Sequence, residues 1–245
     1  MWRDRARSHG RACQDRPGHT PVDPAERQVA TLARFVVTAG PTRQYLDPVR
    51  FLSNASSGKM GYAIARAAVS AGHQVTLISG PTSLRRPRSV RFIPVVTGQQ
   101  MFEAVKDALS GCDCLVMAAA VTDFAPERPF ASKIKKTGRL LTVRLVPVRD
   151  ILRWASRHRP EGSVIVGFAL EDRQTRQRAQ AKLEQKGLDM IIANSPLAIG
   201  ADKVSLQVKT AGSPWLDLPL ASKATQARRI VRLVEALLHS RAKKD

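Results

Sequence analysis

Short apolar runs that end in small residues constrain the fold more than any other feature of this sequence. Runs that are apolar along their whole length are typical of parallel strands, which are buried on both faces. They occupy residues 35–38, 74–79, 114–120, 164–168 and 190–194, with a shorter run at 91–95. Segments with helical spacing lie between them, at residues 59–71, 98–110 and 171–187. This alternation predicts an α/β fold: a Rossmann-like, parallel-rich sheet flanked by helices, in a single domain.

The two ends of the chain differ in pattern. Residues 204–208 alternate in polarity and predict an edge strand, and residues 223–241 predict an amphipathic terminal helix. The N-terminal residues are polar, rich in arginine and without a periodic apolar pattern. We therefore expect a disordered or loosely attached basic extension over residues 1–33 and the folded domain over residues 34–245.

The net charge of +20 invites comparison with nucleic-acid-binding proteins. The basic residues are spread along the whole chain, however, and aromatic residues make up only 5% of it, without interleaving among the basic ones. Solvated arginine-rich faces therefore explain the charge better than a nucleic-acid interface, and the same positive field would attract a small polyanionic substrate.

Cysteine content and hydropathy indicate the compartment. The three cysteines, Cys13, Cys112 and Cys114, are odd in number and lack the spacing of a disulfide framework or a zinc site. No run approaches the roughly 18 apolar residues that a membrane helix needs, and no apolar segment follows the basic N-terminus as in a secretory signal. We expect a cytoplasmic protein that does not bind membranes.

The segment before the helix at 59–71 predicts an anion site. Ser56, Ser57 and Gly58 lead into that helix, whose first N–H groups would face a phosphate, and Lys59 adds a positive charge. A serine N-cap with a glycine turn would produce the same pattern. The segment is no P-loop, because Met60 follows the lysine where that motif requires Ser or Thr.

Two further strand ends carry charged residues. Asp123 follows the small residues that end the run at 114–120, where a carboxylate suits Mg²⁺ or a ribose as well as an ordinary turn. Lys133, Lys135 and Lys136 follow in a loop and suit either a triphosphate or solvent. Lys182 and Lys186 are four positions apart, which places them on one helical face.

Together these segments resemble the phosphopantothenoylcysteine synthetases, the synthetase half of the bifunctional bacterial coenzyme A enzyme. The most specific segment is SNASSGKMG at residues 53–61, followed by AAAVTDF at 118–124 and KIKK at 133–136. The resemblance runs from about Phe35 to Leu238. It further includes residues 38–43, 47–65, 77–84, 150–152, 166–171, 181–194 and 218–223.

The resemblance implies a ligase that forms (R)-4′-phosphopantothenoyl-L-cysteine from 4′-phosphopantothenate and L-cysteine through an acyl-nucleotide. It implies Mg²⁺ and CTP, or else ATP, as the nucleotide, and a homodimer whose lysine loop reaches the partner's site. The flavin-dependent decarboxylase half is not expected in this chain, so a separate phosphopantothenoylcysteine decarboxylase would complete the pathway.

The resemblance also assigns roles to individual residues. Asn54 and Lys133 match the catalytic positions, and Asp123 matches the residue that contacts the nucleotide and its Mg²⁺. The residues that match positions holding the substrate phosphate are Ser56, Ser57, Gly58 and Lys59. Those that match nucleotide contacts, besides Asp123 and Lys133, are Met117, Ala118, Ala119, Asp150, Ile151, Phe168, Lys182 and Lys186.

This chain departs from the family pattern at the expected nucleotide rim. Val148-Arg149 replaces Asn-Pro, Ser195-Pro196 replaces Asp-Val, and the usual Phe and Asn are missing around residues 200–202. These changes bear on which base is bound. Three alternatives stay open: a non-catalytic paralogue, a nucleic-acid-binding protein and an NAD(P)-dependent oxidoreductase. The last lacks the glycine fingerprint, and Arg66 stands where a Tyr-x-x-x-Lys pair starting at Tyr62 needs lysine.

Overall fold

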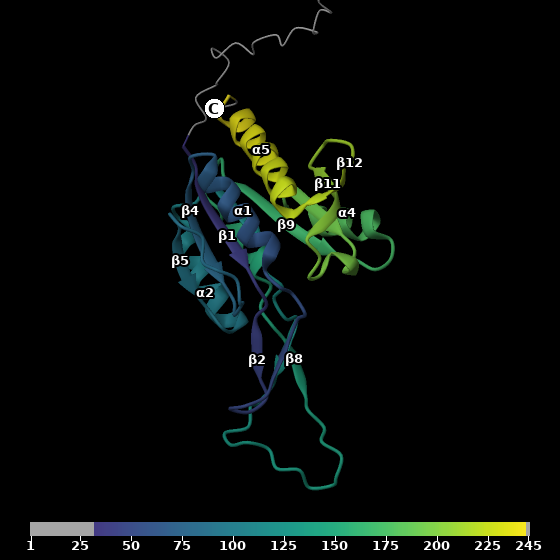
Figure 1. The fold of residues 1–245 in the computed structure, drawn as a ribbon. Helices are drawn as coiled ribbons and strands as arrows, with labels where there is room; N and C mark the ends of the chain where they lie inside the picture. Colours follow the sequence, from purple (N-terminus) through teal and green to yellow (C-terminus); the bar gives the residue numbers. More distant parts are fainter. Residues whose placement is uncertain (1–31, 244–245) are drawn as a thin grey trace, which may run out of the picture. The chain divides into compact units, whose positions relative to one another are not determined.

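A computed structural model describes residues 32–243 of the chain. Its main sheet has eight strands in the order β12-β11-β10-β9-β6-β1-β4-β5 (Figure 1). The strands from β10 to β5 run parallel, and β11 and β12 are antiparallel to their neighbours. The strands are β1 (Arg34–Ala39), β4 (Gln74–Ser79), β5 (Arg91–Pro94), β6 (Cys114–Met117), β9 (Val164–Leu170), β10 (Met190–Asn194), β11 (Lys203–Thr210) and β12 (Leu216–Ser222).

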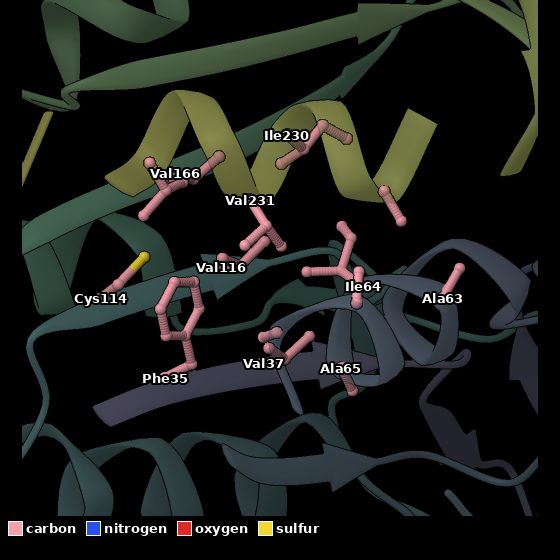
Figure 2. Packing of buried hydrophobic residues seen from close by; sticks show 14 of the residues in the cluster. Phe35, Val37, Ala63, Ile64, Ala65, Cys114, Val116, Val166, Ile230 and Val231 are labelled. Carbon is pink, nitrogen blue, oxygen red and sulfur yellow. The ribbon is translucent and has the colours of Figure 1, made fainter. Parts of the chain in front are cut away.

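Helices cover both faces of this sheet. On one face lie α1 (Lys59–Ser70) and α5 (Lys223–Ala242), and on the other lie α2 (Gly98–Leu109), α3 (Ile151–His158) and α4 (Thr175–Gln185). Figure 2 shows Val231 of α5 next to Val116 of the sheet, with Ile64 of α1 in the same cluster. Each fully buried aliphatic side chain of this kind contributes roughly 1.5–3 kcal/mol of transfer free energy. The predicted α/β class is confirmed.

The predicted elements are correct in kind and wrong in some of their ends. β6 ends at Met117 instead of continuing towards Asp123, because the Ala119 N–H turns to the Thr38 hydroxyl, 3.1 Å away. The helix expected from residue 171 begins at Thr175, after Gln174 in the left-handed region (φ 50°). The strand around 204–208 is not at the edge, because β12 pairs with its outer side.

Two small hairpins were not predicted from the sequence. One joins β2 (Arg43–Tyr45) to β3 (Phe51–Ser53), and the other joins β7 (Phe124–Pro126) to β8 (Leu145–Pro147). β2 contacts β7, so the hairpins that follow β1 and β6 lie side by side (Figure 1). We call residues 43–53 and 124–147 the arm. Three-residue strands are too short to show a period, which is why the pattern missed them.

The remaining observations concern the N-terminal extension, a short turn after β10, the cysteines and membrane-spanning helices. Apart from its last two residues, the extension expected over residues 1–33 lies outside the described residues. A 3₁₀ turn, η2 (Pro196–Ala198), follows β10. Cys112 and Cys114 are buried free thiols, in keeping with the absence of disulfide spacing in the sequence. None of the described helices combines the length and apolar character needed to cross a bilayer.

Candidate active site

The topology of the sheet singles out the carboxyl ends of β1 and β6. These two strands are neighbours, and β1 leads into α1 on one face, whereas the helix that precedes β6 lies on the opposite face. The chain therefore reverses its direction of winding between them. Open α/β sheets bind ligands at such a switch point, beyond the carboxyl ends of the strands. Most of the residues singled out from the sequence lie at this edge.

The N-terminus of α1 has no side-chain cap. In contrast, Thr97, Asp150 and Ser222 cap α2, α3 and α5 with side-chain oxygens. The hydroxyl of Ser56 accepts from the Gly58 N–H (3.3 Å), and that of Ser57 lies 3.5 Å from the Lys59 nitrogen. The N–H groups of the first turn after Lys59 are thus left to a ligand, which makes this helix end suited to an anion.

Gly58 is required at this helix start for two reasons. Its φ of 73° lies in the left-handed region, and a Cβ there would come within 2.8 Å of the Thr82 methyl group and 3.1 Å of the Gly40 nitrogen. Only glycine therefore allows the loop before α1 to lie against the end of β1.

The ammonium group of Lys59 is held by the loop after β10. Its Nζ donates to Asp202 Oδ1 (2.7 Å) and to the Gly200 carbonyl (3.0 Å). This hydrogen bond, and the charge of Lys59, lower the pKa of Asp202. The Lys223 ammonium, at the start of α5, donates to the Ala198 carbonyl (3.0 Å). Lysines at the starts of two helices thus hold the segment 198–202.

Asn54 connects the loop after β1 with the loop after β6. Its Nδ2 donates to the Ala120 carbonyl (3.0 Å), which also accepts from the Thr42 N–H (3.1 Å). The Ala120 N–H donates in turn to the Gly40 carbonyl (3.0 Å). The exposed amide of Asn54 is therefore fixed at the switch point, close to the chain that leads into α1.

The end of β6 offers small side chains beside an aromatic one. Met117 is buried, whereas Ala118 and Ala119 are partly exposed. Met117 pairs with Gly167 in the parallel register, so Phe168, the next residue of β9, lies at the same edge. The structure thus brings together the predicted nucleotide contacts of β6 and β9.

Lys182, Lys186 and Asp150 form a linked group beside Phe168. Lys182 Nζ donates to the Phe168 carbonyl (2.7 Å), and Lys186 Nζ lies 2.8 Å from Asp150 Oδ2. Burial, and next the charge of Lys186, lower the pKa of Lys182. Burial alone would raise the pKa of Asp150, but hydrogen bonds from Lys186 and the Arg153 N–H outweigh it and lower that pKa. Lys186 is the C-cap of α4, one residue beyond the helix proper.

Ile151 and Asp123 differ in exposure. Ile151 is buried in the first turn of α3 and packs into the core, so it anchors the helix start that carries Asp150. Asp123 is exposed, and its side chain has no hydrogen bond or ion pair within residues 32–243. Those residues contain no group of three or more His, Cys, Asp or Glu side chains able to hold a metal ion. Asp123 therefore offers one carboxylate and not a complete metal site.

Lys133 lies apart from the other predicted residues, in the loop that joins β7 to β8. It is exposed, and in the described part of the chain its ammonium has no hydrogen bond or ion pair. Its neighbour Ile134 is bonded through its N–H to Asp47 Oδ2 (3.1 Å) and through its carbonyl to Arg50 (2.6 Å). The structure ties the lysine loop to the β2–β3 turn, not to the sheet edge.

Asp47 is a residue that sequence reasoning did not single out. Its side chain is fully buried and accepts from the backbone of Val49 (2.8 Å) and Arg50 (2.7 Å). Burial alone would raise the pKa of Asp47, but three backbone N–H donors and the charge of Arg50 lower it to about 2. An Asp-Pro dipeptide that starts a turn was the available signal for such a side-chain bond.

Comparison with known proteins agrees with this geometry. Residues 31–238 match the family model described as the DNA/pantothenate metabolism flavoprotein C-terminal domain. The coenzyme A biosynthesis bifunctional protein CoaBC of Bacillus subtilis strain 168 is 41% identical over 207 residues, which cover 82% of this chain and 51% of the relative. CoaBC of Vibrio vulnificus strain CMCP6 is 38% identical over 211 residues, which cover 83% of this chain and 52% of that protein. The chain thus spans about half the length of these curated relatives.

Solved structures give the same result. The crystal structure of the C-terminal domain of CoaBC is 34% identical, with a TM-score of 0.75, and the match covers 86% of this chain and 98% of that one. A Cab2 variant in complex with phosphopantothenate-cysteine has the same fold at 19% identity, with a TM-score of 0.70 and coverage of 86% and 88%. The sequence match over most of the folded chain, together with the shared fold, shows that the chain belongs to the family of DNA/pantothenate metabolism flavoprotein C-terminal domains.

Proposed function

We propose that this chain joins 4′-phosphopantothenate to L-cysteine, a step of coenzyme A biosynthesis, at the expense of a nucleoside triphosphate. The observation that carries the proposal is the uncapped N-terminus of α1 beside the fixed amide of Asn54 at the switch point. An anion site and a hydrogen-bond donor meet there, next to the small, partly exposed side chains of Ala118 and Ala119. The match to CoaBC over the synthetase half supports the same conclusion.

The proposed reaction has two steps. The substrate carboxylate attacks the α-phosphorus of the nucleotide and expels pyrophosphate, and the cysteine amine then attacks the acyl-nucleotide and releases the nucleoside monophosphate. Forming the mixed anhydride activates a carboxylate that is otherwise inert to amines. In this scheme the first turn of α1, with Ser56, Ser57, Gly58 and Lys59, holds the substrate phosphate.

The second step depends on Asn54. As the amine adds, negative charge collects on the acyl oxygen, and a preorganised amide donor stabilises it. Asn54 directs one N–H to Ala120 and has a second for this oxygen. In the first step the charge develops on the phosphates instead, and there we assign the matching role to the ammonium of Lys133.

We propose CTP as the preferred nucleotide, with ATP as the alternative. The sheet-edge residues from Met117 to Ala119, with Phe168, would face the base, and Lys182 and Lys186 would face the phosphates. Mg²⁺ fits this arrangement, because it binds through one or two carboxylates together with substrate phosphates, and Asp123 supplies one exposed carboxylate. Bound there, Mg²⁺ would neutralise charge on the phosphates.

We further propose a homodimer formed through the arm. Large exposed apolar side chains gather on it, and exposed apolar patches mark interaction sites. They are Val49, Phe51, Phe124, Phe130, Leu140, Leu141, Leu145 and Val146. Pairing of two arms would bury this surface and bring the lysine loop of one protomer to the sheet edge of its partner.

Pyrophosphate release by the purified chain tests the proposal. The assay contains 4′-phosphopantothenate, Mg²⁺ and either CTP or ATP, with and without cysteine. Turnover that requires cysteine is expected, faster with CTP. A single burst independent of cysteine would mean that only the first step operates. No release with either nucleotide would overturn the assignment in favour of a non-catalytic paralogue.

One variant links the result to the site. Asn54→Ala is expected to retain the burst of pyrophosphate and to lose about 10²-fold or more of the cysteine-dependent turnover. Gln99→Ala, which removes an exposed amide of α2 bonded to Glu103, is the matched control and should retain full turnover. Equal loss in both steps for Asn54→Ala would contradict the role given to its amide.

A further inference from the structure

Asp47 uses its two carboxylate oxygens for two different tasks. Oδ1 accepts from the Val49 and Arg50 N–H groups, at 2.8 and 2.7 Å, and so closes the turn between β2 and β3. Oδ2 accepts from the Arg50 Nε (2.9 Å) and from the Ile134 N–H (3.1 Å), 87 positions along the chain. One oxygen therefore builds the local turn, and the other fixes a distant segment.

Arg50 completes the attachment of that distant segment. Its Nη2 lies 2.7 Å from Asp47 Oδ2 and donates to the Ile134 carbonyl (2.6 Å). Both backbone groups of Ile134 are thus bonded to one ion pair, in which the Asp47 carboxylate is buried and Arg50 is exposed. A second tie lies four residues earlier, where the Phe130 N–H donates to the Leu46 carbonyl (2.8 Å). The main chain on both sides of Lys133 is therefore attached to the turn at residues 46–50.

The lysine segment has little else to fix it. Lys133, Lys135 and Lys136 are exposed, and Ile134 between them is the half-buried residue of the segment. A long loop whose ends alone were held would leave these ammonium groups spread over many positions, and ordering them on a ligand would cost conformational entropy. Fixing the main chain at Ile134 removes much of that cost in advance.

We propose that Asp47 is a positioning residue for the lysine segment 133–136, acting through the N–H of Ile134 to hold Lys133 ready for the nucleotide phosphates. The catalytic part of this inference rests on the proposed function of Lys133. The attachment of the loop does not depend on it and is tested separately.

Asp47→Asn separates the two tasks of the carboxylate. The amide oxygen in place of Oδ1 still closes the turn, whereas an NH₂ group in place of Oδ2 cannot accept from Ile134. We expect faster hydrogen exchange at the Ile134 amide and several-fold faster tryptic cleavage at Lys133, Lys135 and Lys136. The melting temperature should fall modestly, because the variant also loses the ion pair with Arg50. Glu127→Gln is the matched control, because that carboxylate pairs with Arg144 at the base of the same loop.

The kinetic readout distinguishes positioning from general support of the fold. In Asp47→Asn, kcat for pyrophosphate release should fall at least about tenfold, because small misplacements of a reacting group cost that much or more. KM for 4′-phosphopantothenate should stay within about twofold, because the α1 site is untouched. Glu127→Gln should leave both parameters at the wild-type values.

Each other outcome has a definite meaning. Unchanged exchange and cleavage would overturn the attachment, and faster exchange with wild-type kcat would overturn the positioning role. A wild-type protein without ligase activity would refute the proposed function, while exchange and cleavage would still decide the attachment. If Asp47→Asn fails to fold, Ile134→Pro removes the same N–H donor and leaves the turn intact. Trypsin does not cut before proline, so cleavage at Lys135 and Lys136, together with kcat, must then show the same changes.

Discussion

The sheet edge and the arm hold their lysines in different ways. At the sheet edge the ammonium groups of Lys59, Lys182 and Lys186 are themselves bonded, at 2.7–2.8 Å, to Asp202, the Phe168 carbonyl and Asp150. In the arm Lys133 is exposed, and the structure fixes the main chain of its neighbour instead. A bonded side chain holds its ammonium group at one position for a ligand. A fixed main chain with an unbonded side chain lets the ammonium group move within the reach of that side chain.

Removing a carboxylate that supports the main sheet should reduce stability more than removing one that supports the arm. Asp189, at the opposite end of the sheet, pairs with Arg159 and Arg241 and accepts from the Ile165 N–H (2.7 Å). Asp189→Ala leaves two guanidinium groups without their partner, so the free energy of unfolding should fall by about 3–5 kcal/mol. Urea denaturation measures this loss. Asp47→Asn should shift the midpoint far less, and equal shifts would show that arm and sheet unfold as one unit.

Removing a lysine from each region should alter different kinetic steps. Lys133→Ala should slow pyrophosphate release about 10²-fold with nucleotide affinity nearly unchanged, because it loses charge stabilisation in the transition state. Lys186→Ala should weaken nucleotide binding about tenfold, because it removes an ammonium group that Asp150 already holds at the proposed phosphate position. Single-turnover release and calorimetry separate the two effects. Loss of affinity in both variants would remove the distinction between the regions.

The pH dependence of binding tests the sheet edge alone. Burial lowers the pKa of Lys182, so it loses its proton at a lower pH than an ordinary lysine. Because burial disfavours the charged form of Lys182, its deprotonation at higher pH removes a destabilising effect on the fold. Nucleotide affinity should fall over the same range, by up to about tenfold per pH unit, because the positive charge is lost. Calorimetry between pH 7 and 10 should show this fall, and Lys182→Gln should abolish it. A flat wild-type profile would mean that Lys182 does not contact the nucleotide.

The smallest effect is expected where the partner of a lysine is exposed. Asp202 is mostly exposed, and ion pairs of this kind contribute little. Asp202 also competes with a bound anion for the Lys59 ammonium. Asp202→Asn should therefore bind inorganic phosphate about two- to threefold more tightly, as measured by calorimetry at low salt. Weaker binding would instead show that Asp202 orients Lys59 towards the anion.

Local patterns in the sequence were enough to predict the parallel strands, most of the helices and the family. Apolar runs such as 74–79 and the spacing in α1 are local signals, and burial on both faces of a parallel sheet leaves them little freedom. The strand ends then followed from topology, which is why Asn54, Ala118 and Phe168 could be expected at one edge.

The bonding partners of these residues could not be predicted and depend on how the chain folds in three dimensions. The bonds of Asp47 to Ile134 and of Lys59 to Asp202 join positions 87 and 143 residues apart. No local propensity encodes such pairs, because each depends on how two loops meet once the sheet has formed. The same holds for β11, whose alternating pattern predicted an edge strand. In the structure β12 pairs with it and forms the edge instead. The arm, with strands of three residues, exists because its hairpins pack against each other and not because its sequence prefers strands.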